Sequence, residues 1–354
     1  MTDLTKVLLR RISQNGPMAL AEFIETCLLH PVHGYYTQQN VFGASGDFVT
    51  APETSQMFGE LLGLCLAQSW QDQGCPDPFV LLELGPGRGS LMADLLRATS
   101  RINGFHQAMH LYLYEASKKL VDQQRKNLTG YEPLWIDSLA DLPNLPLFCI
   151  ANEFFDALPV HQYQRKGDAW HEQQVGIADG QLLMGLNKNP SVSPQLQARI
   201  EDTAAGDIVE ISPQSQAIVA QIGNQIESYK GAALIFDYGD WRSLGDTVQA
   251  VKNHQYVDLL TTPGEADLTA HVDFEALAHC APCAHSRLTP QGVLLERLGI
   301  TPRAQALAKN LSGPAIEQHI AAHRRLTHPD EMGKVFKALA LFPKAAAPPP
   351  GFQT

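Results

Sequence analysis

Short apolar runs alternate with amphipathic segments through the middle of the chain. Apolar runs of about four to eight residues are typical of buried strands, and apolar residues recurring every three or four positions are typical of helices. In chain order, the pattern predicts strand 79–84, helix 90–99, strand 110–115, helix 117–127, strand 146–151, helix 214–229 and strand 232–239. Strands that alternate with helices in this way form a parallel sheet, so we expect an α/β fold with a doubly wound sheet.

The segments on either side of this series follow other patterns. We predict two N-terminal helices, a long glycine-containing loop, a helix at 54–73, a small antiparallel meander between 159 and 190, and a helical tail over 301–342. The predicted parts are 1–76 (helices and a binding loop), 77–300 (the sheet domain, with an insertion at 159–213), 301–343 (helical) and 344–354 (a frayed tail).

Composition excludes some classes of protein. The 354 residues are 44% hydrophobic and 18% charged, as in an ordinary globular protein, and the formal charge of −11 argues against a nucleic-acid partner. No uninterrupted apolar run reaches about 18 residues, and the first residues lack the pattern of a secretory signal. We therefore expect a cytoplasmic, bacterial protein without stable membrane insertion. The lone CxxC of Cys280 and Cys283 does not predict a metal site.

The stretch FVLLELGPGRGS carries the clearest chemical signal. Gly85, Gly87 and Gly89 lie between a predicted strand and a predicted helix, where backbone amides can approach a ligand closely. The spacing is GxGxG, whereas dinucleotide sites favour GxGxxG. With Glu83 two residues before the first glycine, the turn favours S-adenosylmethionine. Glu115, at the end of the next strand, is suited to bind both ribose hydroxyls; a purely structural turn is the alternative.

Polar residues also follow the later strands. Asp137 precedes the fourth strand and is a candidate for the adenine amino group, or else a helix N-cap. Asn152, Glu153 and Asp156 come directly after the run LPLFCIA, and ligands of open parallel sheets bind beyond the carboxyl ends of the strands. These three side chains are therefore expected near the reacting centre, although Asp156 could instead cap a helix.

The order of five motifs resembles the MidA family, whose mitochondrial members are protein-arginine methyltransferases that assist assembly of respiratory complex I. The motifs are GDFVTAPETSQMFGELLG, LLELGPGRGSLMADLLR, ANEFFDALPVHQ, ALIFDYG and PGEADLTAHVDF, and the resemblance extends from about residue 3 to residue 342. It implies a Rossmann-like class I methyltransferase fold with S-adenosylmethionine as cofactor. The three glycines, Arg88 and Glu115 carry over as cofactor residues. Asn152 stands where some members are expected to have histidine.

An arginine acceptor would need carboxylates, because guanidinium stays charged at any working pH and must meet a second cation, the sulfonium. The candidates are Glu153, Asp156 and Asp47, with His271 to accept the departing proton. A hydrogen-bonded, structural histidine is the alternative. The leading hypothesis is thus a methyltransferase acting on arginine of a protein, for example a respiratory complex I subunit. The alternatives are a methyltransferase for a small molecule, a non-catalytic assembly factor and an NAD-dependent oxidoreductase.

Overall fold

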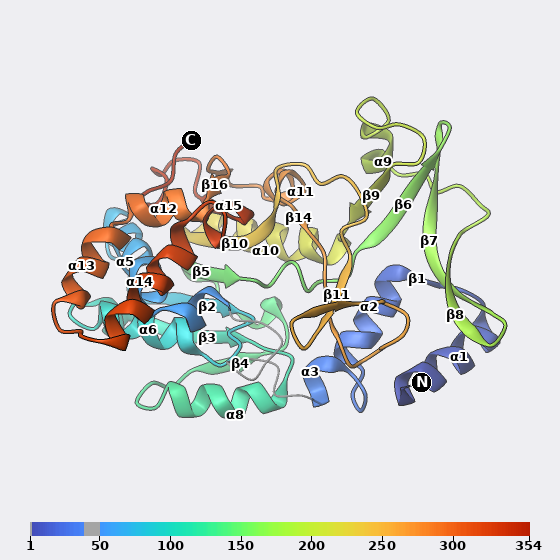
Figure 1. Cartoon of the computed structure of the whole chain (residues 1–354). Coiled ribbons are helices and arrows are strands. Elements are labelled where there is room, and N and C mark those ends of the chain that lie inside the picture. The colour runs from blue at the N-terminus through green and yellow to red at the C-terminus, as the bar shows by residue number, and fades with distance from the viewer. Residues whose placement is uncertain (1, 39–49) are drawn as a thin grey trace. The chain divides into compact units, whose positions relative to one another are not determined.

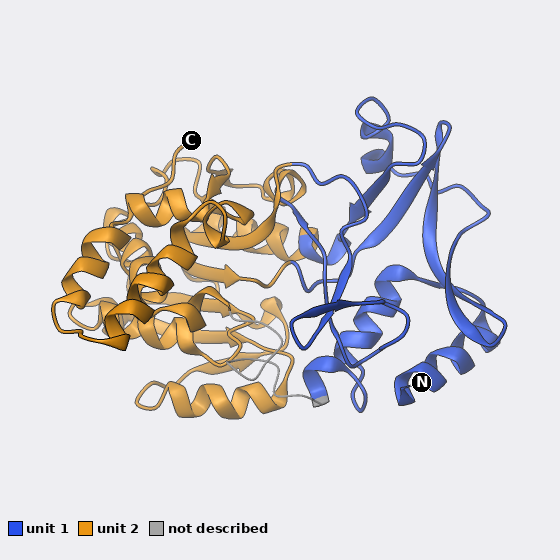
Figure 2. Cartoon of the chain, viewed as in Figure 1, with its two compact units in different colours: residues 1–48, 156–215, 242–273 blue, residues 49–155, 216–241, 274–354 orange. Residues whose placement is uncertain are grey.

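The computed structural model describes residues 2–38 and 50–354 of the chain. The chain forms two compact units, each assembled from three separate stretches (Figure 2). Unit 1 comprises Met1–Phe48, Asp156–Ser215 and Arg242–Asp273, and unit 2 comprises Val49–Phe155, Gln216–Trp241 and Phe274–Thr354. The predicted sheet domain of residues 77–300 is therefore divided between both units, and its predicted insertion at 159–213 lies within unit 1.

Unit 2 is built on the predicted doubly wound sheet (Figure 1). Its strands follow the order β15-β17-β10-β5-β2-β3-β4, and β4, β3, β2, β5 and β10 run parallel. The strands are β2 (Phe79–Leu84), β3 (Met109–Tyr114), β4 (Leu134–Ile136), β5 (Leu147–Asn152), β10 (Gly231–Asp240), β15 (Ala284–His285), β16 (Thr289–Pro290) and β17 (Phe336–Phe342). The predicted bounds of β2 are confirmed, and those of β3, β5 and β10 differ by one residue at each end. The sequence did not predict strands β4, β15, β16 and β17.

Helices alternate with the strands of unit 2 and pack on them. They are α4 (Ala51–Thr54), α5 (Gln56–Asp72), α6 (Ser90–Thr99), α7 (Phe105–Ala108), α8 (Lys118–Asn127), the 3-10 turn Leu139–Asp141, α10 (Pro213–Tyr229, which begins in the last residues of unit 1), α11 (Phe274–Cys280), α12 (Gln291–Arg297), α13 (Ile300–Ala308), α14 (Pro314–Thr327) and α15 (Met332–Val335). The large hydrophobic core between these helices and the sheet contains many side chains with an exposed fraction of 0%.

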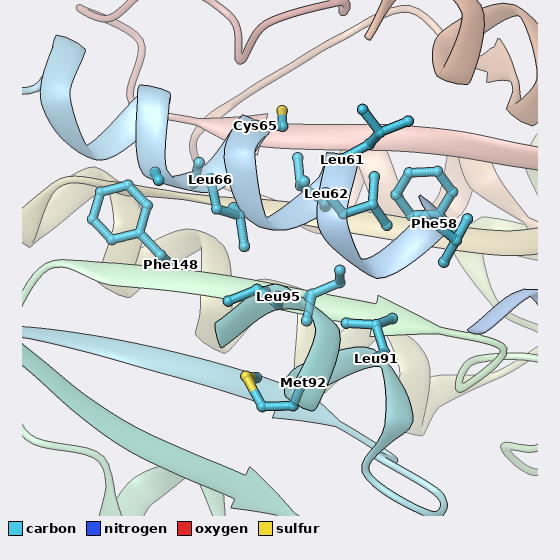
Figure 3. Close-up of a cluster of buried hydrophobic side chains, with 14 of the residues drawn as sticks. Phe58, Leu61, Leu62, Cys65, Leu66, Leu91, Met92, Leu95 and Phe148 are labelled. Carbon is cyan, nitrogen blue, oxygen red and sulfur yellow. The ribbon is translucent and has the colours of Figure 1, made fainter. Parts of the chain in front are cut away.

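Two glycines allow α5 to approach α6 closely (Figure 3). A Cβ atom added at Gly59 would lie 2.8 Å from Cβ of Asp94, and one added at Gly63 would lie 2.7 Å from Cγ of Leu95. Such distances leave no room for a side chain. The motif FGELLG therefore has a packing role: it fixes the helix that follows the glycine turn against the core.

The end of the chain differs from the prediction. A helix was expected over 301–342, but residues Phe336–Phe342 form β17, which pairs antiparallel with β10 and lies between β10 and β15. Leucine and alanine favour helices in isolation, and burial between two strands overrides that preference. The tail predicted to be frayed lies on the core, because Phe352 is buried and the N–H of Arg287 donates to the carbonyl of Gln353 at 2.7 Å.

Unit 1 contains the N-terminal helices and the predicted meander. Its elements are α1 (Asp3–Asn15), β1 (Met18–Ala19), α2 (Leu20–Leu29), α3 (Tyr35–Gln38), β6 (His161–Lys166), β7 (Ala169–Ala178), β8 (Gln181–Leu186), α9 (Pro194–Ala198), β9 (Ile208–Ile211), β11 (Gln249–Lys252), β12 (Gln255–Val257), β13 (Asp267–Thr269) and β14 (Val272–Asp273). Strands β6, β7 and β8 are antiparallel neighbours, which confirms the meander. Asp179 and Gly180 both have positive φ in the tight turn between β7 and β8.

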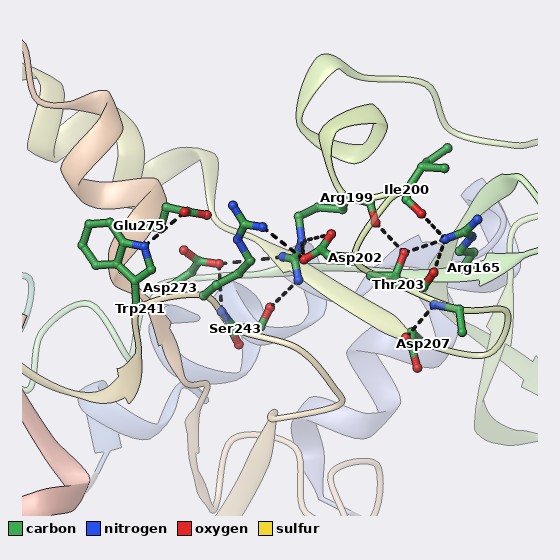
Figure 4. Close-up of polar contacts among 12 residues, drawn as sticks. Arg165, Arg199, Ile200, Asp202, Thr203, Asp207, Trp241, Ser243, Asp273 and Glu275 are labelled. Carbon is green, nitrogen blue, oxygen red and sulfur yellow. Dashed lines mark hydrogen bonds and ion pairs between the residues drawn. The ribbon is translucent and has the colours of Figure 1, made fainter.

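Arginine side chains tie the loops of unit 1 together (Figure 4). Nη1 of Arg165 donates to the carbonyl of Ile200 at 2.6 Å, and the guanidinium of Arg199 donates to Asp202 and to the carbonyl of Ser243. These bonds connect the stretch after α9 to the stretch that begins at residue 242. In the parts of the chain that the structure describes, no helix is both long and apolar enough to cross a membrane.

Candidate functional site

The carboxyl ends of the parallel strands gather the polar residues that the sequence singled out in unit 2. The N–H of Gly85, just after β2, donates to the carbonyl of Tyr114 at the end of β3. The N–H of Glu153, just after β5, donates to the carbonyl of Phe236 in β10 at 2.9 Å. The glycine turn and the residues after β3 and β5 therefore share one edge of the sheet, as expected for the ligand site of such a fold.

The glycine turn needs glycine for its backbone. Gly85, Gly87 and Gly89 have φ of +59°, +53° and +81°, a region that side chains disfavour. A Cβ on Gly85 would also lie only 2.9 Å from the ring of Phe154. Gly89 is the N-cap of α6, so the free amides of that helix face the turn.

Glu53 supports the turn from α4. Its Oε1 accepts a hydrogen bond from Oγ of Ser90 at 2.6 Å, and its Oε2 lies 3.5 Å from Nη1 of Arg88. Arg88 is thus an ion-pair partner of Glu53 beside the turn. Asp47, predicted to lie in the same loop as Glu53, is outside the described residues, and its role stays a prediction from the sequence.

Two buried acceptors at this edge lack partners among the described residues. They are Oε2 of Glu83, at the end of β2, and Oδ1 of Asn152, at the end of β5. Burial, together with the nearby charge of Glu115, raises the pKa of Glu83 to about 8. Unpartnered buried polar atoms are rare in proteins and often mark the place of a ligand, and a ligand that donates hydrogen bonds would satisfy both oxygens.

Glu115 follows β3 and is held on both carboxylate oxygens. Oε1 accepts from the N–H of Ser117 at 2.7 Å, and Oε2 accepts from Nε2 of Gln124 at 3.0 Å. Burial raises the pKa of Glu115 to about 7, and these hydrogen bonds oppose the rise. Sequence reasoning missed Gln124, because one glutamine in a polar helix carries no pattern of its own.

Asp137 lies directly after β4 and before β5, and its predicted role stays a prediction. Burial of the Tyr114 hydroxyl raises the pKa of Tyr114, and the nearby charge of Asp137 raises it further, so the two residues are neighbours. The ring of Tyr114 meets that of Phe154 edge to face at 6.0 Å. Aromatic rings thus line the edge of the sheet between β3 and the residues after β5.

Glu153 is a half-buried carboxylate on a strained backbone. Its φ is +51°, uncommon for a residue with a side chain, and strain of this kind clusters at functional sites. Oε1 accepts from Nδ2 of Asn152 at 3.0 Å and from the N–H of Ala51 at 3.3 Å. Burial raises the pKa of Glu153. A cationic ligand would stabilise its ionised form.

Asp237, Asp156 and His271 are held by hydrogen bonds within the fold. Asp237 in β10 accepts hydrogen bonds from the N–H groups of Phe155 and Tyr238, so it holds the turn after β5. Asp156 and His271 belong to unit 1. The carbonyl of Asp156 accepts from the N–H of Ala270, and the N–H of His271 donates to Oγ1 of Thr247 at 2.8 Å. Asp156 is buried and His271 is exposed, and their predicted catalytic roles stay predictions.

The described residues do not form an evident metal site. Within residues 2–38 and 50–354, no group of three or more histidine, cysteine, aspartate or glutamate side chains is arranged to hold a metal ion. Cys280 and Cys283 are both free thiols.

Comparisons with known proteins assign this chain to a class. A family model described as "Putative S-adenosyl-L-methionine-dependent methyltransferase" matches residues 61–293. The mitochondrial protein arginine methyltransferase NDUFAF7 of Xenopus tropicalis is 36% identical over 96% of this chain and 85% of its own, and the human protein is 34% identical over 97% and 84%. A crystal structure from Burkholderia thailandensis bound to S-adenosylhomocysteine has a TM-score of 0.84 and 26% identity, covering 98% of this chain and 93% of its own.

The fold and the site thus define an S-adenosylmethionine-dependent methyltransferase. The chain belongs to the methyltransferase family whose relatives include the NDUFAF7 proteins, which confirms the resemblance to the MidA family and the expected fold. When bound, the cofactor supplies a methyl group on a sulfonium.

The residues present fit this cofactor. The unpartnered oxygens of Glu83 and Asn152 suit the ammonium donor of its amino-acid end, and the carboxylate of Glu115 suits hydroxyl donors of a ribose. The positive φ values of the glycines leave their backbone open to close approach.

Proposed function

We propose that this methyltransferase transfers the methyl group to an arginine side chain of a protein. The observation that carries the proposal is the carboxylate of Glu153, which is held by Nδ2 of Asn152 and the N–H of Ala51 directly after β5, on the same edge of the sheet as the glycine turn. A carboxylate there can bind a guanidinium through charge-assisted hydrogen bonds and draw its charge away from the attacking nitrogen. The names of the relatives, which are 34–37% identical, support the same acceptor.

In this proposal, different residues bind different parts of the cofactor. Glu83 and Asn152 bind the amino-acid end, and Gly85, Gly87 and Gly89 admit it through their backbone. Glu115 binds the ribose and Asp137 the adenine amino group. Arg88, paired with Glu53, supports the turn from outside.

Glu153 binds and orients the acceptor, since alignment of the nitrogen with the methyl carbon is the main requirement of an in-line displacement. Asp156 and His271 are the further candidates from the sequence, as a second carboxylate and as the proton acceptor. We place the reaction in the bacterial cytoplasm, which fractionation of tagged cells tests. A respiratory complex I subunit is the first acceptor to examine, because the relatives carry the NDUFAF7 name.

The test uses the purified protein, S-adenosylmethionine with a labelled methyl group, and a lysate of cells that lack the gene. Acid hydrolysis of the labelled protein fraction should yield methylarginine, and the Gly87→Val variant should yield none. Label in small molecules alone would favour a small-molecule acceptor. Cofactor binding without any transfer would favour a non-catalytic assembly factor.

The role of Glu153 has a separate test. Glu153→Gln should lower kcat at least about tenfold while the Kd for S-adenosylhomocysteine stays within about twofold, because the lost interaction is with the acceptor. Glu132→Gln, the same change at an exposed position, is the matched control. An equal loss of cofactor affinity would remove Glu153 from the acceptor site.

A further inference from the structure

Gln124 occupies an unusual position in the helix that follows Glu115. It is the one buried residue of α8, whose ten residues all lie in the described part of the chain, and its exposed fraction is 0%. Helices normally bury an apolar stripe. A buried amide destabilises a protein unless its polar atoms are hydrogen-bonded, so this glutamine needs an explanation.

Both polar atoms of the Gln124 amide are bonded, each to a group at the cofactor site or beside it. Nε2 donates to the carbonyl of Gly87 at 2.8 Å and to Oε2 of Glu115 at 3.0 Å. Oε1 accepts from Nε1 of Trp135 at 2.7 Å. The glycine turn after β2 and the carboxylate after β3 are thereby joined through one side chain.

The chemistry of these partners fixes the orientation of the amide. An indole N–H only donates, whereas a backbone carbonyl and a carboxylate oxygen only accept. If the amide were flipped, its oxygen would face two acceptors and its NH₂ group would face the indole N–H. Trp135 therefore selects the orientation in which Gln124 donates both hydrogens toward the site.

A second amide of α8 reinforces the contact with the turn. Nδ2 of Asn127, three residues later, donates to the carbonyl of Arg88 at 2.8 Å. Residues three apart lie on the same face of a helix, so α8 binds two consecutive carbonyls of the glycine turn. Of these two side chains, only Gln124 also donates to Glu115.

We propose that Gln124 is a positioning residue for the cofactor: it locks the carboxylate of Glu115 in register with the glycine turn, so that Glu115 presents its free lone pairs to the ribose. This inference rests on the ribose role proposed for Glu115, and it is independent of the methyl acceptor. Gln124 does not itself touch the cofactor in this scheme. It acts through Glu115.

The test replaces Gln124 by methionine, which keeps the length and packing of the side chain but removes its hydrogen bonds. Calorimetry compares S-adenosylhomocysteine with its 2′,3′-dideoxy analogue, which lacks the ribose hydroxyls. We expect Gln124→Met to raise the Kd of S-adenosylhomocysteine about tenfold and that of the analogue less than about twofold, since only the first ligand uses Glu115. Gln221→Met, the same change at an exposed position of helix α10, should leave both unchanged.

A double-mutant cycle separates positioning from packing. Gln124→Met combined with Glu115→Ala should bind S-adenosylhomocysteine within about twofold of Glu115→Ala alone, because the effect passes through Glu115. Equal losses for the two ligands, or additive losses in the cycle, would overturn the proposal. If Gln124→Met lowers the melting temperature too far to measure binding, Trp135→Phe provides the same readout, with a smaller ligand-selective loss expected.

The ribose role of Glu115 and the positioning role of Gln124 can be refuted separately. If Glu115→Ala weakens both ligands equally, the ribose role of Glu115 is wrong and this inference falls with it. If Glu115→Ala is selective for the hydroxyls and Gln124→Met is not, the ribose role stands and the positioning role of Gln124 is refuted.

Discussion

Replacement of Glu83 by glutamine is predicted to raise the free energy of unfolding and to weaken cofactor binding. Its carboxyl group is buried and one oxygen has no partner among the described residues. The ordinary pKa of 4.5 is raised to about 8 in the fold by burial and by Glu115. Between these values the folded protein keeps a proton that the unfolded chain has lost. The contribution of Glu83 to stability is therefore complete below pH 4.5 and is lost as the pH rises through 8.

The magnitude follows from the size of the shift. One pKa unit corresponds to about 1.36 kcal/mol, so the interval from 4.5 to about 8 sets an upper limit of about 5 kcal/mol. Entry of water at high pH reduces this figure. We expect Glu83→Gln, which cannot ionise, to gain about 2–4 kcal/mol of stability relative to the wild type between pH 5 and pH 9.

Urea unfolding of both proteins without cofactor, at pH 5, 7 and 9, measures this gain. Glu132→Gln, at an exposed position, is the control, and its difference in stability from the wild type should not depend on pH. The same Glu83→Gln protein should bind S-adenosylmethionine at least about tenfold more weakly, because a carboxylate partner of the ammonium group is lost. A difference in stability between Glu83→Gln and wild type that does not change with pH would refute the assignment of Glu83 as a buried, unpartnered acid.

Three further results are expected. Gly87→Val should abolish cofactor binding in calorimetry while the circular dichroism spectrum is kept, since valine disfavours the φ of +53°; unchanged affinity would contradict the site. Glu115→Ala should weaken S-adenosylhomocysteine by about 1.5–3 kcal/mol, and a loss below about 0.5 kcal/mol would mean that another residue holds the ribose. Gly63→Val should lower the free energy of unfolding, measured with urea, by about 1–3 kcal/mol, because the added atoms overlap Leu95. An unchanged midpoint would show that α5 and α6 can separate freely.

Much of the candidate site could be predicted from the sequence because its signals are local. The turn of Gly85, Gly87 and Gly89 requires positive φ values that glycine adopts readily. Three closely spaced glycines are therefore enough to predict the turn from the sequence. Glu83 and Glu115 are placed by the ends of their strands, and the alternation of strands and helices predicts that parallel strands bring those ends to one edge. The same reasoning predicted the meander of β6, β7 and β8, whose turn carries an Asp-Gly pair.

Tertiary structure decided the features that depend on contacts between distant segments. Residues 336–342 look helical by composition and become a strand because β10 offers a paired edge and burial. Glu53 is tied to Ser90 and Arg88 across 35 or more residues, and no local pattern announces such a bond. Gln124 is the clearest case: a glutamine in a polar helix is ordinary by sequence. Its proposed role depends on the fold, which brings Gly87, Glu115 and Trp135 within hydrogen-bond distance of one amide.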